Sequence, residues 1–284
     1  MTTSVFLAVV FAACLHAAWN SLIKGSADKH TAMLGVVLGH VPICIVMILL
    51  APPFNTEALP WMIGGIFLHL GYQQFLITAY RLADLTLVYP IARGSAPLIV
   101  TVVSVAVLGL SFTVFEVSGV LLITFGVVFL AFAKRIDGTR DLRGVVLALG
   151  TGGFIAAYSL VDGIGARVAD SPLGFWSWAA LGNAVLFTCW TALVRPKTFA
   201  GLRSDRSAMV MGLGGGTASF LAYGLVIWAF TQAPIALVTA LRETSIVFAL
   251  LIGTIILKER VTRVKIISAG VIIAGAAVLR ISIS

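Results

Sequence analysis

Three ionisable side chains stand inside long apolar stretches of this sequence: Arg93, Arg242 and Glu243. A charged side chain within a lipid bilayer costs at least about 2.5–3.5 kcal/mol on insertion scales, so each of them requires a partner or a function. When the chain is shifted by 150 residues, Arg93 falls on Glu243. We therefore expect these two side chains to meet where two halves of the molecule join.

The three charges have two interpretations. In the first, Arg93 and Glu243 form a structural ion pair and backbone carbonyls satisfy Arg242. In the second, the arginines bind an anionic group of a small-molecule substrate through their planar, bidentate guanidinium groups. Glu243 would then bind a substrate amine or carry a coupling proton. We favour the second interpretation because an ion pair accounts for only one of the two arginines. The remaining positive charge predicts a carboxylate, phosphonate or phosphate on the ligand.

Two prolines, Pro90 and Pro97, bracket Arg93, and Gly94 lies beside it. Proline removes a backbone donor and clashes with the preceding turn, so the helix that carries Arg93 should kink or open there. The result is either an ordinary proline kink or a broken helix whose free backbone groups face a ligand. The stretch that carries Glu243 has no proline at the matching place. The sequence therefore predicts an opening on one side only.

The first apolar stretch places His16, Trp19 and Asn20 on one helical face, because their spacings are three and four residues. His16 is the titratable group of this stretch and is either a coupling-proton carrier or a neutral, hydrogen-bonded histidine. A shift of 139 residues lays Trp19 over Tyr158. The remaining candidates for substrate binding are aromatic or amide side chains, and these are Tyr72, Gln73, Tyr89, Tyr158 and Tyr223. We expect no metal site and no cofactor.

Other polar and aromatic residues have simpler expected roles. Trp176 and Trp178 begin an apolar stretch and are expected to form an interfacial belt. Asp162 is expected to end a helix near Arg167, at the surface. The GxxxG pairs Gly35–Gly39 and Gly212–Gly216 allow close approach of helices.

Ten apolar stretches must position these residues, in a chain of 284 residues that is 60% hydrophobic and 11% charged. About 20 mostly apolar residues cross a bilayer, and each stretch has roughly that length. The fold class predicted is an all-α membrane protein with ten transmembrane helices. We place the helices near residues 4–23, 31–51, 60–80, 86–108, 113–133, 143–162, 173–194, 207–230, 235–257 and 264–281.

The Lys and Arg residues alternate from loop to loop, and 15 of the 19 lie after the first, third, fifth, seventh and ninth stretches. By the positive-inside rule these loops are cytoplasmic, which places both termini outside. This distribution also explains the net charge of +8 without nucleic acid as a partner. Five helices per half is an odd number, so two similar halves, residues 1–135 and 143–284, must be inverted relative to each other. Inverted halves around a central cavity are typical of secondary transporters.

Three segments carry a resemblance to a known family: HAAWNSLIKG at 16–25, ADLTLVYPIARGSAPL at 83–98, and PIALVTALRETSIVFALLIGTIILKERVT at 234–262. With its closing Lys258-Glu259-Arg260, the chain resembles the drug/metabolite transporter superfamily, EamA type, over both halves. The resemblance implies a ten-helix basket whose first, third, fourth, sixth, eighth and ninth helices line a cavity. The fifth and tenth helices are then peripheral.

The function expected is that of a secondary-active transporter, not an enzyme, because no nucleophile with a base, paired acids or metal ligands appears at a membrane face. The resemblance favours export driven by proton exchange. The unpaired arginine favours a small polar metabolite that is anionic or zwitterionic, such as an amino acid, organic acid or phosphonate. The alternatives are a flippase for a lipid-linked substrate and a multidrug or cation exporter. The expected partners are this substrate and the lipid of a plasma or inner membrane. The expected unit is a monomer or homodimer.

Overall fold

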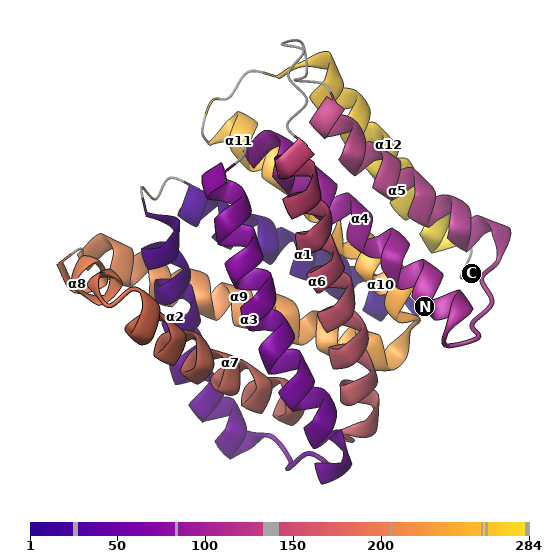
Figure 1. Cartoon of the computed structure of the whole chain (residues 1–284). Helices are drawn as coiled ribbons and strands as arrows, with labels where there is room; N and C mark the ends of the chain where they lie inside the picture. Colours follow the sequence, from indigo (N-terminus) through magenta and orange to yellow (C-terminus); the bar gives the residue numbers. More distant parts are fainter. Residues whose placement is uncertain are drawn as a thin grey trace.

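The computed structural model describes residues 1–24, 28–82, 85–132, 142–204, 206–256, 258 and 261–281. Within these ranges the regular secondary structure is helical (Figure 1). Glu259 and Arg260 lie outside these ranges, as does the predicted end of the first half at residue 135. Three of the basic residues counted after the fifth stretch also lie outside them: Lys134, Arg135 and Arg140.

The described helices correspond to the ten predicted stretches, with one helix interrupted and one short helix added. The bounds are α1 Thr3–Lys24, α2 Lys29–Leu50, α3 Leu59–Leu82, α4 Leu85–Ala106, α5 Val114–Phe132, α6 Leu142–Val168, α7 Pro172–Val194, α8 Lys197–Ser204, α9 Arg206–Gln232, α10 Ile235–Arg242, α11 Ser245–Ile255 and α12 Arg263–Ile281, with a 3₁₀ turn at Thr56–Ala58.

Local sequence fixes several helix starts. The Asp28 carboxylate accepts the backbone N–H of His30 and begins α2, and the Ser171 hydroxyl accepts the N–H of Gly174 and begins α7. Before α5, the Glu116 carboxylate accepts the Thr113 N–H while the Thr113 hydroxyl accepts the Glu116 N–H. This reciprocal pair is a capping box.

Nine spans in the described ranges are long and apolar enough to cross a membrane, with α10 and α11 counted together. The helix α3 has 24 residues but is not among the nine, because polar side chains such as His69 and Gln73 lower its hydropathy. Large apolar side chains such as Leu49, Val114 and Leu193 are exposed on the outside, as lipid contact requires. The chain is therefore a multi-pass membrane protein, and the span of α3 stays a prediction.

The helix interruption lies on the opposite side from the one that the prolines predicted. The helix α4 continues through Pro90 and Pro97, whereas α10 ends at Arg242 and α11 begins at Ser245. Between them Glu243 and Thr244 donate their backbone N–H groups to carbonyls three residues back, and the Thr244 hydroxyl donates to the carbonyl of Leu241 at 2.8 Å. The Thr244 hydroxyl competes with backbone N–H groups for a carbonyl of the helix. This competition explains a tight turn that forms without proline.

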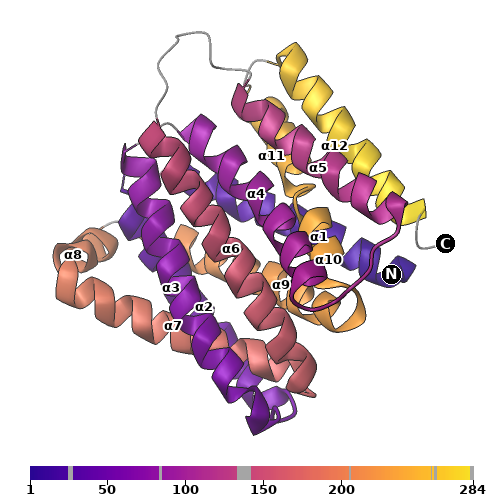
Figure 2. The same cartoon turned by 45° about the vertical axis from the view of Figure 1, so that its right-hand side comes forward.

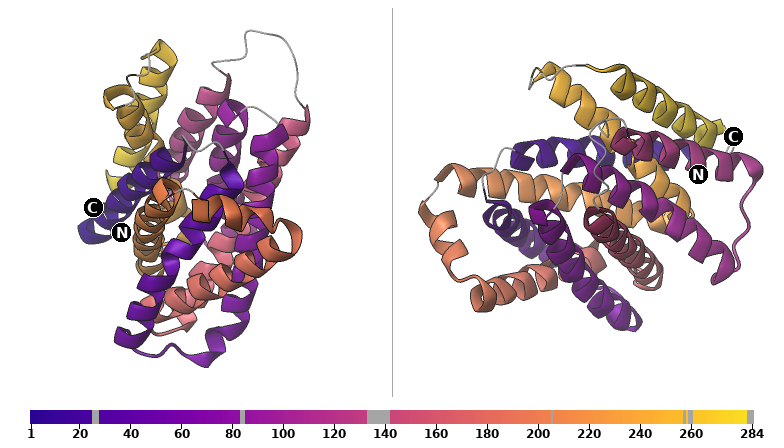
Figure 3. Two further views of the ribbon diagram at one scale, coloured as in Figure 1. Left: turned by 90° about the vertical axis from the view of Figure 1, so that its left-hand side faces the viewer. Right: turned by 45° about the horizontal axis from the view of Figure 1, so that its top comes forward.

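The arrangement of the helices brings distant parts of the chain together. The helices α5 and α12 pack side by side at one edge, the peripheral position that the resemblance implied (Figure 2). Arg280, near the end of α12, donates to the Thr3 hydroxyl at 2.7 Å, so the N- and C-terminal ends lie close together (Figure 3). In the rest of the bundle, α1 packs against α9 and α11, while α6 packs against α3 and α4.

The two GxxxG pairs face each other between α2 and α9. A Cβ atom on Gly212 would lie 2.8 Å from the backbone of Gly35, and one on Gly216 would lie 2.6 Å from that of Gly39. No side chain fits at these distances, so glycine permits the contact, as predicted. This contact sets the position of α9 against the first half.

Candidate functional site

The first polar group in the bundle interior consists of His16, Arg93, Glu243 and Ser245, here called the arginine cluster. Arg93 donates from Nε to Glu243 Oε2 at 2.7 Å and from Nη2 to the Ser245 hydroxyl at 3.1 Å. Its Nη1 lies 3.5 Å from His16 Nε2, which accepts because a guanidinium has no acceptor atom. The pairing of Arg93 with Glu243 that the 150-residue shift predicted is confirmed.

The elements around this cluster explain its geometry. Arg93 lies in the middle of α4, in the first half of the chain, whereas Glu243 lies in the turn between α10 and α11 and Ser245 begins α11. Glu243 and Ser245 thus stand on either side of Thr244, and both reach one guanidinium. Arg93 and Glu243 are 3% and 0% exposed, so the pair is fully removed from solvent.

Arg242 directly precedes this turn and has a different environment. It is 3% exposed, and its Nε and Nη2 atoms have no hydrogen-bond partner among the described residues. The guanidinium carbon lies 5.8 Å from the centre of the Tyr223 ring, within cation–π range. The proposal that carbonyls satisfy Arg242 therefore does not hold for these two nitrogen atoms.

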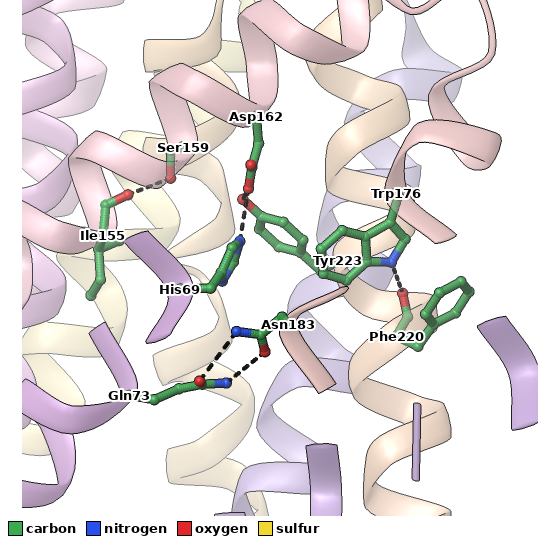
Figure 4. Close-up of polar contacts among 9 residues, drawn as sticks. All are labelled: His69, Gln73, Ile155, Ser159, Asp162, Trp176, Asn183, Phe220 and Tyr223. Carbon is green, nitrogen blue, oxygen red and sulfur yellow. Dashed lines mark hydrogen bonds and ion pairs between the residues drawn. The ribbon is translucent and has the colours of Figure 1, made fainter. Parts of the chain in front are cut away.

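The second polar group consists of His69, Asp162 and Tyr223, here called the aspartate cluster. His69 from α3, Asp162 from α6 and Tyr223 from α9 point toward one another (Figure 4). The His69 Nε2 atom and the Tyr223 hydroxyl each lie 2.8 Å from Asp162 Oδ2. The other carboxylate oxygen, Oδ1, is buried and has no partner among the described residues.

The position of Asp162 corrects the sequence analysis. The helix α6 continues to Val168, six residues beyond the predicted end, so Asp162 is inside the helix and 0% exposed. Gly65 on α3 makes room for it, because a Cβ atom at Gly65 would collide with Asp162 Oδ1. In the sequence, the helix could have been expected to continue because no proline or polar run directly follows Asp162. The glycines at 163 and 165 made this continuation hard to predict, because they suggest a helix end.

Aromatic rings surround the aspartate cluster. Tyr158 stacks on His69 with ring centres 4.3 Å apart, and it meets the Tyr72 ring edge-on at 5.5 Å. Trp176 contacts Tyr223 at 4.7 Å and donates its indole N–H to the Phe220 carbonyl at 3.1 Å. The prediction that Trp176 is a belt residue is therefore wrong, because its own polar atom finds a partner inside the bundle. Trp178 is 45% exposed.

Gln73 makes a separate contact between the halves. Its side-chain amide exchanges two hydrogen bonds with that of Asn183 on α7, at 3.0 and 3.3 Å (Figure 4). Both side chains are buried. This exchange occupies one donor and one acceptor of each amide. Gln73 therefore joins α3 to α7, and it does not line the cavity described next.

A small cavity of about 60 Å³ opens beside the arginine cluster. Six of the predicted site residues line it: His16, Trp19, Asn20, Tyr72, Tyr89 and Arg93. Five others, Gln73, Tyr158, Tyr223, Arg242 and Glu243, do not. The lining of this cavity comes from α1, α2, α3, α4 and α6. The contribution of α9 and α10–α11 to a larger transport cavity stays a prediction.

Residues 142–281 match the model of the EamA-like transporter family. This match covers the second half of the chain and supports its resemblance to the EamA type. Solved structures in 29 chains also match. One crystal structure of a protein is 18% identical, with a TM-score of 0.73, over 99% of this chain and 96% of its own. At that identity the likeness shows the fold alone. No curated protein matches.

The EamA-like transporter is thus a membrane transporter of small molecules, and its family consists of transporters rather than enzymes. Drug-sized ligands occupy pockets of about 300–1,000 Å³, so the cavity must widen before it admits a metabolite. The buried charges of the protein also differ from those that the sequence analysis counted. The described residues bury two arginines, Arg93 and Arg242, and two acids, Asp162 and Glu243. Asp162 supplies the negative charge that the sequence analysis did not count.

Proposed function

We propose that this EamA-like transporter is a secondary carrier of a small metabolite with an anionic group, and that Arg242 is the residue that binds this group. The observation that carries the proposal is the buried Arg242 side chain, whose Nε and Nη2 atoms lack partners. A carboxylate, phosphonate or phosphate presents oxygen atoms at the spacing that a guanidinium fork accepts. Amino acids, organic acids and phosphonates all carry such a group.

Because Arg242 is buried, the absence of hydrogen-bond partners for its Nε and Nη2 atoms costs free energy. A buried donor without an acceptor costs about 1–3 kcal/mol, and a charged donor costs more. Arg93 has no such deficit, because Glu243, Ser245 and His16 occupy its nitrogen atoms. An incoming anion therefore gains more at Arg242 than at Arg93. The two arginines that the sequence analysis treated alike have different roles in this proposal: Arg93 joins the halves, and Arg242 binds the ligand.

The packing supports two inverted five-helix halves, residues 1–135 and 143–284. If α1 corresponds to α6, α3 to α9 and α4 to α10–α11, the packing of α1 on α9 and α11 repeats that of α6 on α3 and α4. Side-chain bridges cross between these halves at Arg93–Glu243, His69–Asp162 and Gln73–Asn183. We infer that the halves rock against each other and expose the centre alternately.

The orientation of the chain is also a proposal. The concentration of Lys and Arg in alternate loops supports both termini outside the cell, in a plasma or inner membrane. The adjacent termini accord with an even number of spans. Export and the coupling to protons rest on the family resemblance and stay predictions.

A thermal-shift screen of purified protein tests the substrate class. Amino acids, organic acids, methylphosphonate and cationic drugs are compared on the natural chain, on Arg242→Ala, and on Arg203→Ala as a surface control. A ligand that binds the folded state stabilises it by mass action. We expect anionic or zwitterionic compounds to stabilise the natural chain and the control but not Arg242→Ala. Equal stabilisation of Arg242→Ala would refute the role of Arg242.

A cationic substrate is the second candidate, because one observation favours it. Asp162 is a buried acid with an unpartnered oxygen, and Tyr158, Trp176 and Tyr223 surround it, as aromatic rings surround bound cations in other proteins. Stabilisation by cationic drugs that is lost in Asp162→Asn would establish this candidate. Stabilisation by lipid alone would instead favour a flippase.

A further inference from the structure

We propose that His69 and Asp162 form a proton-binding site, and that this site supplies the coupling ion of the transporter. The inference rests on the proposed function for its coupling role, but the proton site itself is tested independently of any substrate. It differs from the two proton carriers considered in the sequence analysis, Glu243 and His16. The ligand is a single proton, which binds at the imidazole ring of His69.

The donor and acceptor inventory defines the step. An ionised carboxylate only accepts hydrogen bonds, so His69 in its neutral form donates Nε2–H to Asp162 Oδ2. The lone pair then lies on Nδ1, where an incoming proton forms a bond. The product is an imidazolium that keeps its hydrogen bond to the same carboxylate, and no other bond breaks. The His69 side chain is 14% accessible against 1% for Asp162, so the proton reaches the pair through the imidazole.

Charge balance gives the site its affinity. With His69 neutral, the pair carries one buried negative charge, and the carboxylate oxygen Oδ1 has no partner. An isolated buried charge is expensive, whereas a hydrogen-bonded pair of opposite charges recovers much of that cost. One proton on His69 therefore converts an unbalanced site into a neutral ion pair. Histidine is also the side chain whose charge ordinarily changes between about pH 5 and 8.

The groups around the pair come from α2, α6, α7, α9 and α10. The hydroxyl of Tyr223 on α9 bonds Asp162, and Tyr158 on α6 stacks on His69. Trp176 on α7 lies between His69 and His40 on α2, with ring centres 6.0 and 6.4 Å away respectively. Arg242 at the end of α10 lies over the Tyr223 ring, 5.8 Å from its centre. Both ring nitrogens of His40 are buried without a partner, so His40 does not share the carboxylate.

The arginine cluster is a poorer place for a transported proton. Glu243 holds Arg93 at 2.7 Å, and a proton on this carboxylate would leave the buried guanidinium without its counter-charge. A proton on His16 would place a second positive charge 3.5 Å from Arg93 Nη1 and remove the acceptor that this nitrogen uses. Protonation of either group weakens the cluster. Protonation of His69 strengthens its bond to Asp162.

Tyr223 connects the proton site to the proposed substrate site. Its hydroxyl binds Asp162 and its ring lies beneath Arg242. Without the proton, the net negative charge of the pair offsets the positive charge of Arg242. With the proton, the pair is neutral and Arg242 attracts an anion more strongly. Proton and anion should therefore bind together, which favours co-transport over the exchange expected from the family resemblance.

Solid-state NMR of the reconstituted protein with ¹⁵N-labelled histidine rings tests the site, with the proton itself as the probe. The chain has four histidines, so single substitutions assign each signal. We expect the signal removed by His69→Gln to convert from neutral imidazole to imidazolium as the sample is acidified. Asp162→Asn should weaken or abolish this conversion, because it removes the carboxylate that holds the imidazolium.

His30→Gln is the matched control, because it removes a buried histidine that stacks on Phe187 and should leave the response of His69 unchanged. If Asp162→Asn fails to fold, Tyr223→Phe serves instead: it keeps the ring, removes one donor from Asp162 and should move the midpoint. A His69 that stays neutral at every pH at which the protein remains folded, or that gives the same response in every variant, overturns the proposal. Displacement of the proton from His69 by Na⁺ also overturns the proposal. Failure of the anion screen with a normal His69 titration would refute the substrate class and leave the proton site intact.

Discussion

The arginine cluster and the aspartate cluster are both buried acid–base pairs that join the first half of the chain to the second, but they differ in the base. Arg93 keeps its charge under all conditions in which the protein is folded, whereas His69 can be neutral or charged. The first pair is therefore a fixed bond. The second pair can change its net charge without any change in its partners.

The surroundings of the two pairs reinforce this difference. The Nε, Nη1 and Nη2 atoms of Arg93 all have partners, and its side chain is only 4% accessible. Each acid keeps one buried oxygen without a partner among the described residues, Glu243 Oε1 and Asp162 Oδ1, but only His69 retains an appreciable accessible surface. The comparison teaches that a pair whose base is enclosed and permanently charged holds the halves in register. A pair whose base is accessible and can change its charge is the place where a proton alters the balance between conformations.

Glu243→Gln should give the largest effect, because it leaves Arg93 buried without a counter-charge. Removal of one partner from a buried ion pair costs about 3–5 kcal/mol. Chemical unfolding of the purified protein in detergent measures this loss as a lower transition midpoint. Glu116→Gln, which alters an exposed acid at the start of α5, is the control and should change stability much less.

A double substitution of Arg93 and Glu243 by leucine sharpens this test. Because both buried charges disappear together, the double variant should recover most of the stability lost in Glu243→Gln. A double variant as unstable as Glu243→Gln would show that shape, rather than charge pairing, makes the arginine cluster important. A Glu243→Gln variant with the same unfolding midpoint as the natural chain would show that the two clusters do not differ as described.

Asp162→Asn should cost less, about 1.5–3 kcal/mol, because the groups left behind are neutral. The loss weakens two hydrogen bonds, from His69 and from Tyr223, without stranding a permanent charge. The same unfolding measurement at neutral pH gives the comparison. A loss as large as that of Glu243→Gln would mean that His69 is already charged at that pH, and the distinction between fixed and variable pairs would fail.

The sequence predicted the arginine cluster better than the aspartate cluster, and the reason is physical. Arg93 and Glu243 are strongly polar residues in the middle of apolar stretches, so their burial and their pairing follow from the cost of charge in lipid. Asp162 lies six residues before the end of α6, where a surface position is equally consistent with hydropathy. Its partners come from α3 and α9, and no periodicity within one helix identifies such a contact.

The interrupted helix shows a second limit of the sequence. Prolines predicted an opening in α4, but neighbouring helices and side chains can satisfy the backbone groups that proline frees. The tight turn at Glu243 depends instead on Thr244 and on the attraction of Arg93 for Glu243 and Ser245. Helix propensity alone does not predict this tertiary contact.

Gly212→Ala should give a smaller effect that falls mainly on the aspartate cluster. An added methyl group would collide with the backbone of Gly35, push α9 away from α2, and thereby displace Tyr223 from Asp162. Such overpacking costs about 1–3 kcal/mol, partly offset by the better helix propensity of alanine. The control is Gly214→Ala, where nothing lies within 4 Å of the added atom. Gly212→Ala should alter the His69 titration, whereas Gly214→Ala should leave it unchanged.

Arg242→Met should have the smallest effect on stability and the clearest effect on function. The substitution keeps an unbranched side chain beside Tyr223 and removes a buried charge whose Nε and Nη2 have no partner, so the free energy of unfolding should change by less than about 1 kcal/mol or rise. Arg93→Met, by contrast, strands Glu243 and should cost about 3–5 kcal/mol. In proteoliposomes loaded with the anion that the thermal-shift screen selects, Arg242→Met should lose transport while it remains folded. A folded variant that transports normally would assign the unpaired guanidinium to structure and leave Asp162 as the remaining candidate for substrate recognition.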